Sequence, residues 1–226
     1  MEALADEQAS LLAHAGALLI NIGTLSLAAI AGMHAAVKAA GVHRTPVVLD
    51  PVAAGATPLR RALVVELLDT HGASVIKANA GEVAAVLGFA EVGMQGVDSV
   101  GAFANPVEAV VALSRMHRCV VAMTGVIDYV SNGDTTVAVR NGHAMQATVT
   151  GTCCLAGSAI ATFVAFARDA PMLGALTGIV AVNLAAEHAA RRPDVRGPGS
   201  FRPAFLDELH ALTSEHILAE ARIDMC

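Results

Sequence analysis

The sequence predicts an α/β layer fold, with a mainly parallel central sheet and helices on both of its faces. Three observations lead to this prediction: short apolar runs recur along the chain, a helix-length segment follows each run, and polar residues stand where the runs end. Strands that are buried on both faces read as continuous apolar runs, which is the pattern here. The 226 residues are 55% hydrophobic and 15% charged, so the chain can bury one sizeable core. We therefore expect a single domain over residues 1–226.

Four units of strand and helix follow one another in the first half of the chain. The strands are expected at residues 17–22, 46–51, 74–79 and 119–125. A surface helix at 2–14 precedes the first strand, and further helices are expected from Ser26 to about residue 40 and at 58–70, 80–87 and 106–116. Ser26 is the predicted N-terminal cap of its helix, and Gly41 the predicted stop.

The second half predicts hairpins followed by buried helices. Residues 128–130 and 135–140 flank the turn Asn132-Gly133-Asp134, and Asn141-Gly142-His143 is expected to turn the chain again. Apolar segments at 159–167 and 172–191 indicate buried helices, and residues 197–201 predict a rigid break before a last helix at 203–212. Charged residues interrupt the apolar stretches before they reach the roughly 20 residues of a membrane span. We therefore expect no membrane partner.

Composition and charge exclude further classes. The net charge is −6, and the fourteen Lys and Arg residues are scattered, which argues against nucleic-acid binding. Glu2, Asp6 and Glu7 stand where a signal peptide would have a basic and then apolar start. The four cysteines lack the spacing of a disulfide framework. These features together predict a cytoplasmic protein.

Polar residues at the strand ends define the expected site. They are Gly23 and Thr24 after the first strand, Asp50 at the end of the second, Asn79 at the end of the third, and Thr124 and Gly125 at the end of the fourth. Ligands of open α/β sheets bind in the crevice outside the carboxyl ends of the strands. We therefore expect these residues to face one site.

A small polar turn at residues 149–158 runs into the apolar helix and predicts an anion site. Thr150, Gly151, Thr152 and Cys153 can present backbone N–H groups as an anion hole, with Thr152 as the predicted cap of the helix. A helix start also favours the thiolate form of a nearby thiol, which concerns Cys154. The plain alternative is a glycine turn before a buried helix.

These residues together suit phosphoryl transfer. Asp50 and Glu82 are candidate Mg²⁺ ligands, directly or through water, because Mg²⁺ prefers one or two carboxylates and keeps much of its hydration. Lys77 would meet the phosphates. Taken singly, Glu82 could be a solvated helix charge, Lys77 a surface residue and Asp50 a strand-end cap. The chain contains no P-loop motif and no Gly-x-Gly-x-x-Gly motif, and its histidines lack zinc-site spacing.

With these residues assembled, the chain resembles the hydroxyethylthiazole kinase family of the ribokinase-like superfamily. The resemblance runs over nearly the whole chain and lies in the order and spacing of eight motifs. They are Asn21-Ile22-Gly23-Thr24-Leu25, residues 49–57 from Leu49-Asp50-Pro51 onward, Asn79-Ala80-Gly81-Glu82, Gly96-Val97-Asp98-Ser99, Thr124-Gly125 with Asp128, Asn141-Gly142-His143, Val149-Thr150-Gly151 with Cys154, and Gly197-Pro198-Gly199-Ser200-Phe201.

The resemblance implies ATP-dependent phosphorylation of the hydroxyl of 4-methyl-5-(2-hydroxyethyl)thiazole, a step of thiamine biosynthesis and salvage, with Mg²⁺ required. By matching positions, Lys77, Asn79 and Thr124 would bind ATP, and Asp50 and Glu82 would hold Mg²⁺ partly through water. Met1, Gly23, Thr24 and Gly151 would bind the thiazole. Cys154 takes the place of the Asp base of sugar kinases in the superfamily. A homotrimer with its sites between subunits is also implied.

Three departures from the family pattern generate alternatives. Family members carry a further N-terminal strand and helix, which we expect this chain to lack. Lys77 stands where the family usually has Arg, and Cys153 stands where it usually has Gly. The Cys153 side chain is expected to crowd the phosphate cradle and reduce turnover. The alternatives are a catalytically impaired homologue that binds ligand or pairs with an intact subunit, and a kinase for another small alcohol such as hydroxymethylpyrimidine or a sugar.

Overall fold

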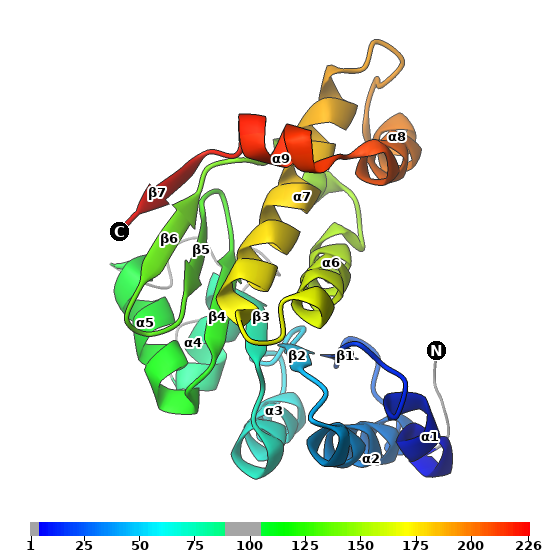
Figure 1. Cartoon of the computed structure of the whole chain (residues 1–226), viewed down its shortest axis with the longest axis vertical. Helices are drawn as coiled ribbons and strands as arrows, with labels where there is room; N and C mark the ends of the chain where they lie inside the picture. The colour runs from blue at the N-terminus through cyan, green and yellow to red at the C-terminus, as the bar shows by residue number, and fades with distance from the viewer. Residues whose placement is uncertain (1–4, 89–104) are drawn as a thin grey trace.

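A seven-stranded mixed sheet forms the centre of the computed structural model, which describes residues 5–88 and 105–226 (Figure 1). The strands lie side by side in chain order: β1 Leu18–Asn21, β2 Val47–Asp50, β3 Val75–Asn79, β4 Val120–Thr124, β5 Asp128–Ser131, β6 Thr136–Val139 and β7 Ile223–Met225. The first four pair in parallel, and the pairs from β4 to β7 are antiparallel. The predicted α/β layer fold is therefore confirmed, while the described sheet is mixed, with three parallel and three antiparallel pairs.

Helices cover both faces of the sheet. The described ones are α1 Gln8–Leu12, α2 Leu27–His43, α3 Pro58–His71, α4 Ala80–Leu87, α5 Pro106–His117, α6 Thr152–Phe166, α7 Pro171–Arg191, α8 Pro198–Ala211 and α9 Ser214–Glu220, with 3-10 turns at η1 Ala5–Glu7 and η2 Ala144–Thr148. One core joins the sheet to α2, α3, α4 and α5, and a second core on the other face joins it to α6, α7 and α8. Figure 1 shows α6 and α7 on the opposite side of the sheet from α4 and α5.

Alternation along β3 explains how its charged residue reaches the site. Ile76 and Ala78 belong to the core under α2 to α5, whereas Val75 belongs to the core under α6 and α7. Because successive strand side chains point to opposite faces, Lys77 shares the face of Val75. The lysine is therefore directed towards the layer that contains α6.

Local signals predicted the helix starts well and some helix ends poorly. Ser26 caps α2 by accepting a hydrogen bond from Ala29 N at 3.0 Å, as predicted. Gly41 does not stop that helix, however, which continues to His43 and ends at Arg44 in the left-handed conformation with φ 53°. A glycine marks a helix end only where the backbone takes a positive φ, and Gly41 lies inside the helix instead.

Two sequence predictions in the second half were wrong, and two elements were missed. Asn141-Gly142-His143 does not form a second hairpin turn, because the chain continues into the 3-10 turn η2 and β6 pairs with β7 instead. Residues 197–201 are not a break before the last helix: Gly197 precedes α8, and Pro198 occupies its first turn, where the missing N–H costs nothing. Helix α9 and strand β7 follow α8, and neither was predicted.

Helix α7 is the central buried helix of its layer. It is the described helix that is long and apolar enough to span a membrane, and 72% of that window is buried inside the fold, as in the core helix of a globular domain. Two of its glycines allow α6 to come close. A Cβ on Gly178 would lie 2.7 Å from Ile160 Cα, and one on Gly174 would lie 2.8 Å from Val164 Cα. The backbone contact between α6 and α7 therefore requires glycine at both positions.

Gly178→Ala should destabilise the fold by about 1–3 kcal/mol, because the added methyl group pushes against helix backbone, which cannot rotate away as a side chain can. Urea unfolding followed by circular dichroism measures the change. Gly41→Ala is the matched control: it also lies in a helix, a Cβ there meets nothing within 4 Å, and it should stabilise by about 0.5–1 kcal/mol. Equal effects of the two substitutions would contradict this account of the helix crossing.

A buried carboxylate on α7 holds the C-terminal strand in place. Glu187 Oε1 accepts hydrogen bonds from Gly142 N at 2.7 Å and from Arg222 Nη2 at 2.5 Å, while Arg222 N donates to Asn141 Oδ1 at 2.7 Å. Burial alone would raise the pKa of Glu187, but the hydrogen bonds from Arg222 and Gly142 outweigh it and lower the pKa below 4.5. The Asn141-Gly142 motif therefore anchors the end of the chain.

Glu187→Gln should destabilise the protein by about 1–3 kcal/mol at pH 7. We expect a value near the lower end of this range, because Arg222 is half exposed and solvent screens its charge. A lowered native pKa gives stability that is complete above the unfolded value of 4.5 and is lost as the pH falls through the native pKa. The difference between variant and wild type should therefore shrink below pH 4.5, which urea unfolding at pH 7 and pH 4 can measure. Asp224→Asn, in an exposed pair with Arg140, is the control and should change stability by less than about 0.5 kcal/mol.

Candidate active site

The carboxyl ends of β1, β2 and β3 bring together an asparagine, an aspartate and a lysine. Asp50 and Lys77 are both fully buried, and Lys77 Nζ donates to Asp50 Oδ1 at 3.3 Å. Asn21 Nδ2 donates to Asp50 Oδ2 at 2.9 Å. Parallel pairing sets Asn21 beside Asp50, because the two residues are partners in register. The predicted joint placement of Asp50 and Lys77 is therefore present, and Asn21 joins them.

Burial and charge act in opposite directions on this pair. Burial raises the pKa of Asp50 to about 6, although Lys77 and the Asn21 hydrogen bond oppose the rise. Burial alone would lower the pKa of Lys77, but the facing Asp50 carboxylate outweighs it and raises that pKa above the ordinary lysine value. Lys77 is therefore held as a cation inside the protein. A fixed buried cation interacts with an anionic ligand far more strongly than a solvated one does.

Glu82 organises the loops around the site with both of its carboxylate oxygens. Oε1 accepts from Ala53 N at 2.9 Å, and Oε2 accepts from Asn79 N at 2.8 Å. Asn79 Oδ1 in turn accepts from Glu82 N at 2.9 Å, which completes a capping box at the start of α4. Ala53 takes a positive φ of 55°, so the Glu82 hydrogen bond holds the loop after β2 in a sparsely populated conformation.

The two buried carboxylates fit a hydrated Mg²⁺ ion. Each oxygen of Asp50 and Glu82 already accepts a hydrogen bond within the protein, and a carboxylate oxygen has a second acceptor direction left. Mg²⁺ keeps several waters and binds through one or two carboxylates. Among the described residues, no group of three or more His, Cys, Asp or Glu side chains gathers as a metal site. The donor set therefore suits contact through water better than a cage of protein ligands.

Arg60 on α3 connects the loops that follow β1 and β2. Its guanidinium donates to Ile22 O at 2.7 Å, to Gly23 O at 3.0 Å and to Val52 O at 3.1 Å. Gly23 N also donates to Asn21 Oδ1 at 2.9 Å. Sequence reasoning missed Arg60 and Asn21. Arg60 stands three residues after the helix cap Thr57, a position that resembles an ordinary solvated helix charge.

The second turn of α6 packs against the carboxylate of Asp50. A Cβ on Gly157 would lie 3.2 Å from Asp50 Oδ2, tighter than an ordinary contact, so glycine favours this close approach of the helix. Gly151 precedes the helix with φ 99°, and a Cβ there would meet nothing within 4 Å. The predicted cap Thr152 is wrong: Gly151 occupies the cap position, and the Thr152 hydroxyl donates backwards to Gln146 O at 2.7 Å and Val149 O at 3.0 Å.

The two adjacent cysteines face different surroundings. Cys153 Sγ lies 2.6 Å from Lys77 Nζ, so its side chain reaches into the site instead of displacing the helix start. Burial of the sulfur raises the pKa of Cys153, and the nearby Lys77 opposes this only in part. Cys154 is a half-buried free thiol. Neighbours on a helix point about 100° apart, which places Cys154 on the side of the exposed Ser158.

The loop after β4 is held by a buried carboxylate. Gly125 N donates to Asp128 Oδ1 at 2.8 Å, and Thr124 Oγ1 donates to Ala78 O at 3.5 Å. Burial raises the pKa of Asp128 to about 6, against the hydrogen bonds from Gly125 and Asn183. Since Asn79 and Thr124 are partners in register, this loop adjoins the start of α4.

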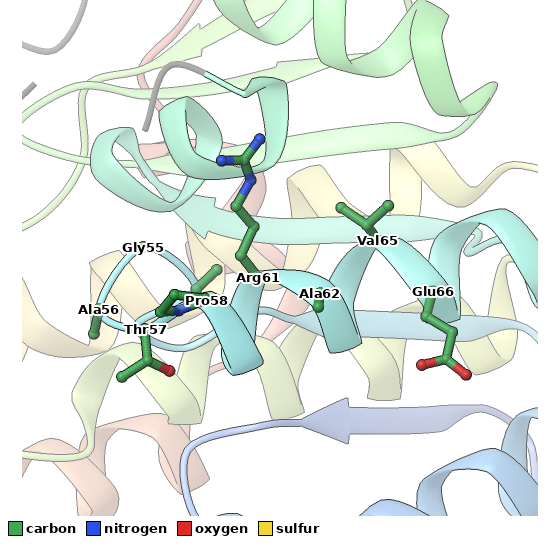
Figure 2. A pocket seen from close by; sticks show the side chains of 9 residues that line it. Gly55, Ala56, Thr57, Pro58, Arg61, Ala62, Val65 and Glu66 are labelled. Carbon is green, nitrogen blue, oxygen red and sulfur yellow. The ribbon is translucent and has the colours of Figure 1, made fainter. Parts of the chain in front are cut away.

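Other predicted residues lie apart from this cluster or outside the described chain. Thr24 and Thr150 are exposed at the loop after β1 and before α6. Met1 and the motif Gly96-Val97-Asp98-Ser99 lie outside the described residues. A surface pocket of about 720 Å³ runs along α3 and is lined by Ala54, Gly55, Ala56, Thr57, Pro58, Arg61, Ala62, Val65 and Glu66 (Figure 2). It shares only the loop after β2 with the polar cluster.

Comparison with known proteins shows which family the chain resembles in sequence. Residues 1–215 match the model of the hydroxyethylthiazole kinase family. The chain is 42% identical over 220 residues to a hydroxyethylthiazole kinase of Roseiflexus sp. (strain RS-1), covering 97% of this chain and 80% of that protein. It is 43% identical over 218 residues to one of Chloroflexus aggregans, covering 96% of this chain and 77% of that protein.

Comparison with solved structures gives the same family. The hydroxyethylthiazole kinase protein of Pyrococcus horikoshii OT3 has a TM-score of 0.87 at 33% identity, covering 98% of this chain and 81% of that one. A pyridoxal kinase of Staphylococcus aureus in complex with AMP-PCP has a TM-score of 0.62 at 14% identity, covering 98% and 78%, which shows only a shared fold. The chain belongs to the hydroxyethylthiazole kinase family.

Proposed function

We propose that this protein transfers the γ-phosphate of ATP to the hydroxyl of 4-methyl-5-(2-hydroxyethyl)thiazole in thiamine biosynthesis and salvage. The observation that carries the proposal is the buried Asp50–Lys77 pair beneath the glycine-led start of α6, in a chain of this family. A cation and unpaired helix amides on one side of an open turn suit a phosphate group. Asp50 and Glu82 would hold Mg²⁺, partly through its waters, and the ion would supply positive charge against the phosphates.

In the proposed reaction, each group has a defined task. The amides at Gly151, Thr152 and Cys153 and the Lys77 ammonium stabilise charge on the transferred phosphoryl group. The substrate hydroxyl oxygen bonds to the γ-phosphorus as the bond from that phosphorus to the β–γ bridging oxygen breaks, and ADP leaves. The hydroxyl proton passes to the Cys154 sulfur. Thr124 and Asn79 contact the nucleotide, while Gly23 and Thr24 contact the thiazole.

A second candidate is a homologue that binds ligands but transfers phosphate slowly. The contact between Cys153 Sγ and Lys77 Nζ favours it, because a phosphate that approaches Lys77 must displace the thiol. Hydrogen bonds to a charged group are worth about 1.5–3 kcal/mol, and this one is partly buried with Cys153 exposed, so its loss is expected to slow transfer by up to about tenfold. The two candidates differ in rate and share the same ligands.

We also propose a cytoplasmic homotrimer with the sites between subunits. Exposed apolar side chains near the site support a subunit contact there. Leu27 is 89% exposed at the start of α2, and Val126 is 99% exposed after β4, both just beyond strand ends that face the site. Analytical ultracentrifugation gives the mass: a trimer supports the proposal, and a monomer at micromolar concentration overturns it.

The function is tested by incubating purified protein with ATP, Mg²⁺ and hydroxyethylthiazole and following thiazole phosphate by mass spectrometry. Formation of thiazole phosphate and ADP in equal amounts is expected. Hydroxymethylpyrimidine and a sugar serve as competing acceptors. Phosphorylation of one of these in preference to the thiazole overturns the proposed substrate, and ligand binding by calorimetry without any transfer supports the slow homologue instead.

Cys154→Ser should lower kcat by about 10²–10⁴-fold with little change in KM, because an alcohol is a far weaker base and general base catalysis contributes this much. Steady-state kinetics measures the effect. Cys226→Ser is the matched control, since Cys226 is an exposed free thiol at the C-terminus, and it should retain full activity. A Cys154→Ser variant as active as the control would show that the proton leaves by another route.

Cys153→Gly should raise kcat/KM for ATP about tenfold, because Lys77 is freed for phosphate and the amide of residue 153 is kept. Cys153→Ser is the companion variant: its hydroxyl still accepts from Lys77, so it should gain much less. Unchanged kinetics of Cys153→Gly would mean that the thiol moves aside without cost.

A further inference from the structure

A line of buried and partly buried hydrogen bonds joins the loop after β4 to the start of α6. Asp128 Oδ1 accepts from Gly125 N at 2.8 Å, and Asp128 Oδ2 accepts from Asn183 Nδ2 at 2.6 Å. Asn183 Oδ1 then accepts from Gln146 Nε2 at 3.2 Å. The backbone oxygen of Gln146 accepts from the Thr152 hydroxyl at 2.7 Å. The line therefore begins at a nucleotide-binding loop of the proposed kinase and ends at its phosphate cradle.

Asn183 is the central member, and its amide can adopt only one orientation. It is 7% exposed on α7, in a run of apolar core residues. Its amino group donates to the carboxylate of Asp128 and to Asn141 O at 2.9 Å, both of which only accept, so the carbonyl must face Gln146. The neighbours of Asn183 therefore fix which atom of its amide makes each of these three hydrogen bonds.

The neighbours of Asn183 are themselves fixed. Gln146 Oε1 accepts from His143 N at 3.0 Å, which orients its amino group towards Asn183. Gly142, beside them, has φ 133°, and a Cβ there would lie 3.3 Å from Gln146 Oε1 and 3.5 Å from Asn183 Cγ. Side chains with so little freedom transmit a displacement at one end to the other.

An asparagine in the apolar interior of α7 requires a physical explanation. An unpaired buried amide costs free energy, and a leucine of similar size would pack in the apolar interior of α7 without partners. An asparagine that satisfies groups from β5, η2 and the residues before η2 instead ties α7 to positions that lie 55, 37 and 42 residues away in the sequence.

We propose that Asn183 is a positioning residue that couples the nucleotide-binding loop at Thr124–Gly125 to the phosphate cradle at 150–153. It contacts neither substrate nor ATP. Through Asp128 it holds the Gly125 amide, and through Gln146 it holds the turn on which Thr152 rests, so the two ends of the triphosphate site keep one spacing. The kinetic part of this inference rests on the proposed function, whereas the structural coupling does not.

The structural part is tested by hydrogen exchange measured by mass spectrometry. Asp128→Asn places an amino group against Gly125 N or Asn183 Nδ2, so it perturbs one end of the line. Exchange in peptide 150–155, at the other end, should accelerate at least threefold, and this effect should vanish when Asn183→Leu is already present. Asp134→Asn is the matched control, with a side chain 92% exposed on the β5–β6 turn, and should leave that peptide unchanged. Acceleration confined to peptide 123–128 overturns the coupling.

The kinetic part uses Asp128→Asn, Thr152→Val and their double variant, in chains that carry either Asn183 or Asn183→Leu. With Asn183 present, the effects on kcat/KM for ATP should be non-additive by at least threefold; with Asn183→Leu they should multiply. A purely structural Asn183 would lower the melting temperature and leave KM and kcat of the folded fraction unchanged, which overturns the proposal. If no thiazole is phosphorylated, the ATP dissociation constant from calorimetry replaces kcat/KM, with the same two outcomes.

Discussion

The ion pair between Asp50 and Lys77 is the interaction on which the rest of the site depends. A buried charge without a partner is strongly unfavourable, so each residue is tolerable only because the other is present. The surroundings supply the remaining contacts: Asn21 from β1 and Cys153 from α6. Parallel pairing of β1, β2 and β3 is what aligns these groups, because it sets their carboxyl ends in one row. The fold therefore creates a low-dielectric position for a permanent cation beside the turn that we propose as the phosphate cradle.

The pairing changes from parallel to antiparallel at β4, and the two halves of the sheet have different roles. The parallel half presents strand ends and their loops to the site. In the antiparallel half, β5 to β7, the ion pair between Glu187 and Arg222 holds the last strand in place, and Asp128 is the first residue of β5. Helix α7 packs against both halves and carries Asn183 and Glu187, so it supports the loop after β4 and the C-terminal strand at once.

Much of this architecture could be predicted from the sequence, because the signals concerned are local. Apolar runs located β1 to β4, and the strand-end rule brought Asp50 and Asn79 to one edge. The last strand could not be predicted, since all three residues of β7 are exposed and the strand exists only through pairing with β6. Asn183 could not be singled out either, because its partner Asp128 lies 55 residues away. Thr152 was misassigned because its hydroxyl donates back to Gln146 O and Val149 O, whereas a cap oxygen accepts from the first helix N–H groups, and Gly151 takes the cap position.

The three hydrogen bonds of Arg60 have a consequence for how substrate preference can change in such a protein. The planar guanidinium of Arg60 donates hydrogen bonds to carbonyl oxygens of two separate loops. Lengthening either loop by a residue would therefore disrupt the hydrogen bonds that hold the two loops together. The two loops, which include Gly23 and Thr24 of the proposed thiazole site, are therefore fixed in length and free only in their side chains. An engineer who seeks a bulkier or smaller alcohol should exchange side chains such as Thr24 and keep the loop lengths as they are.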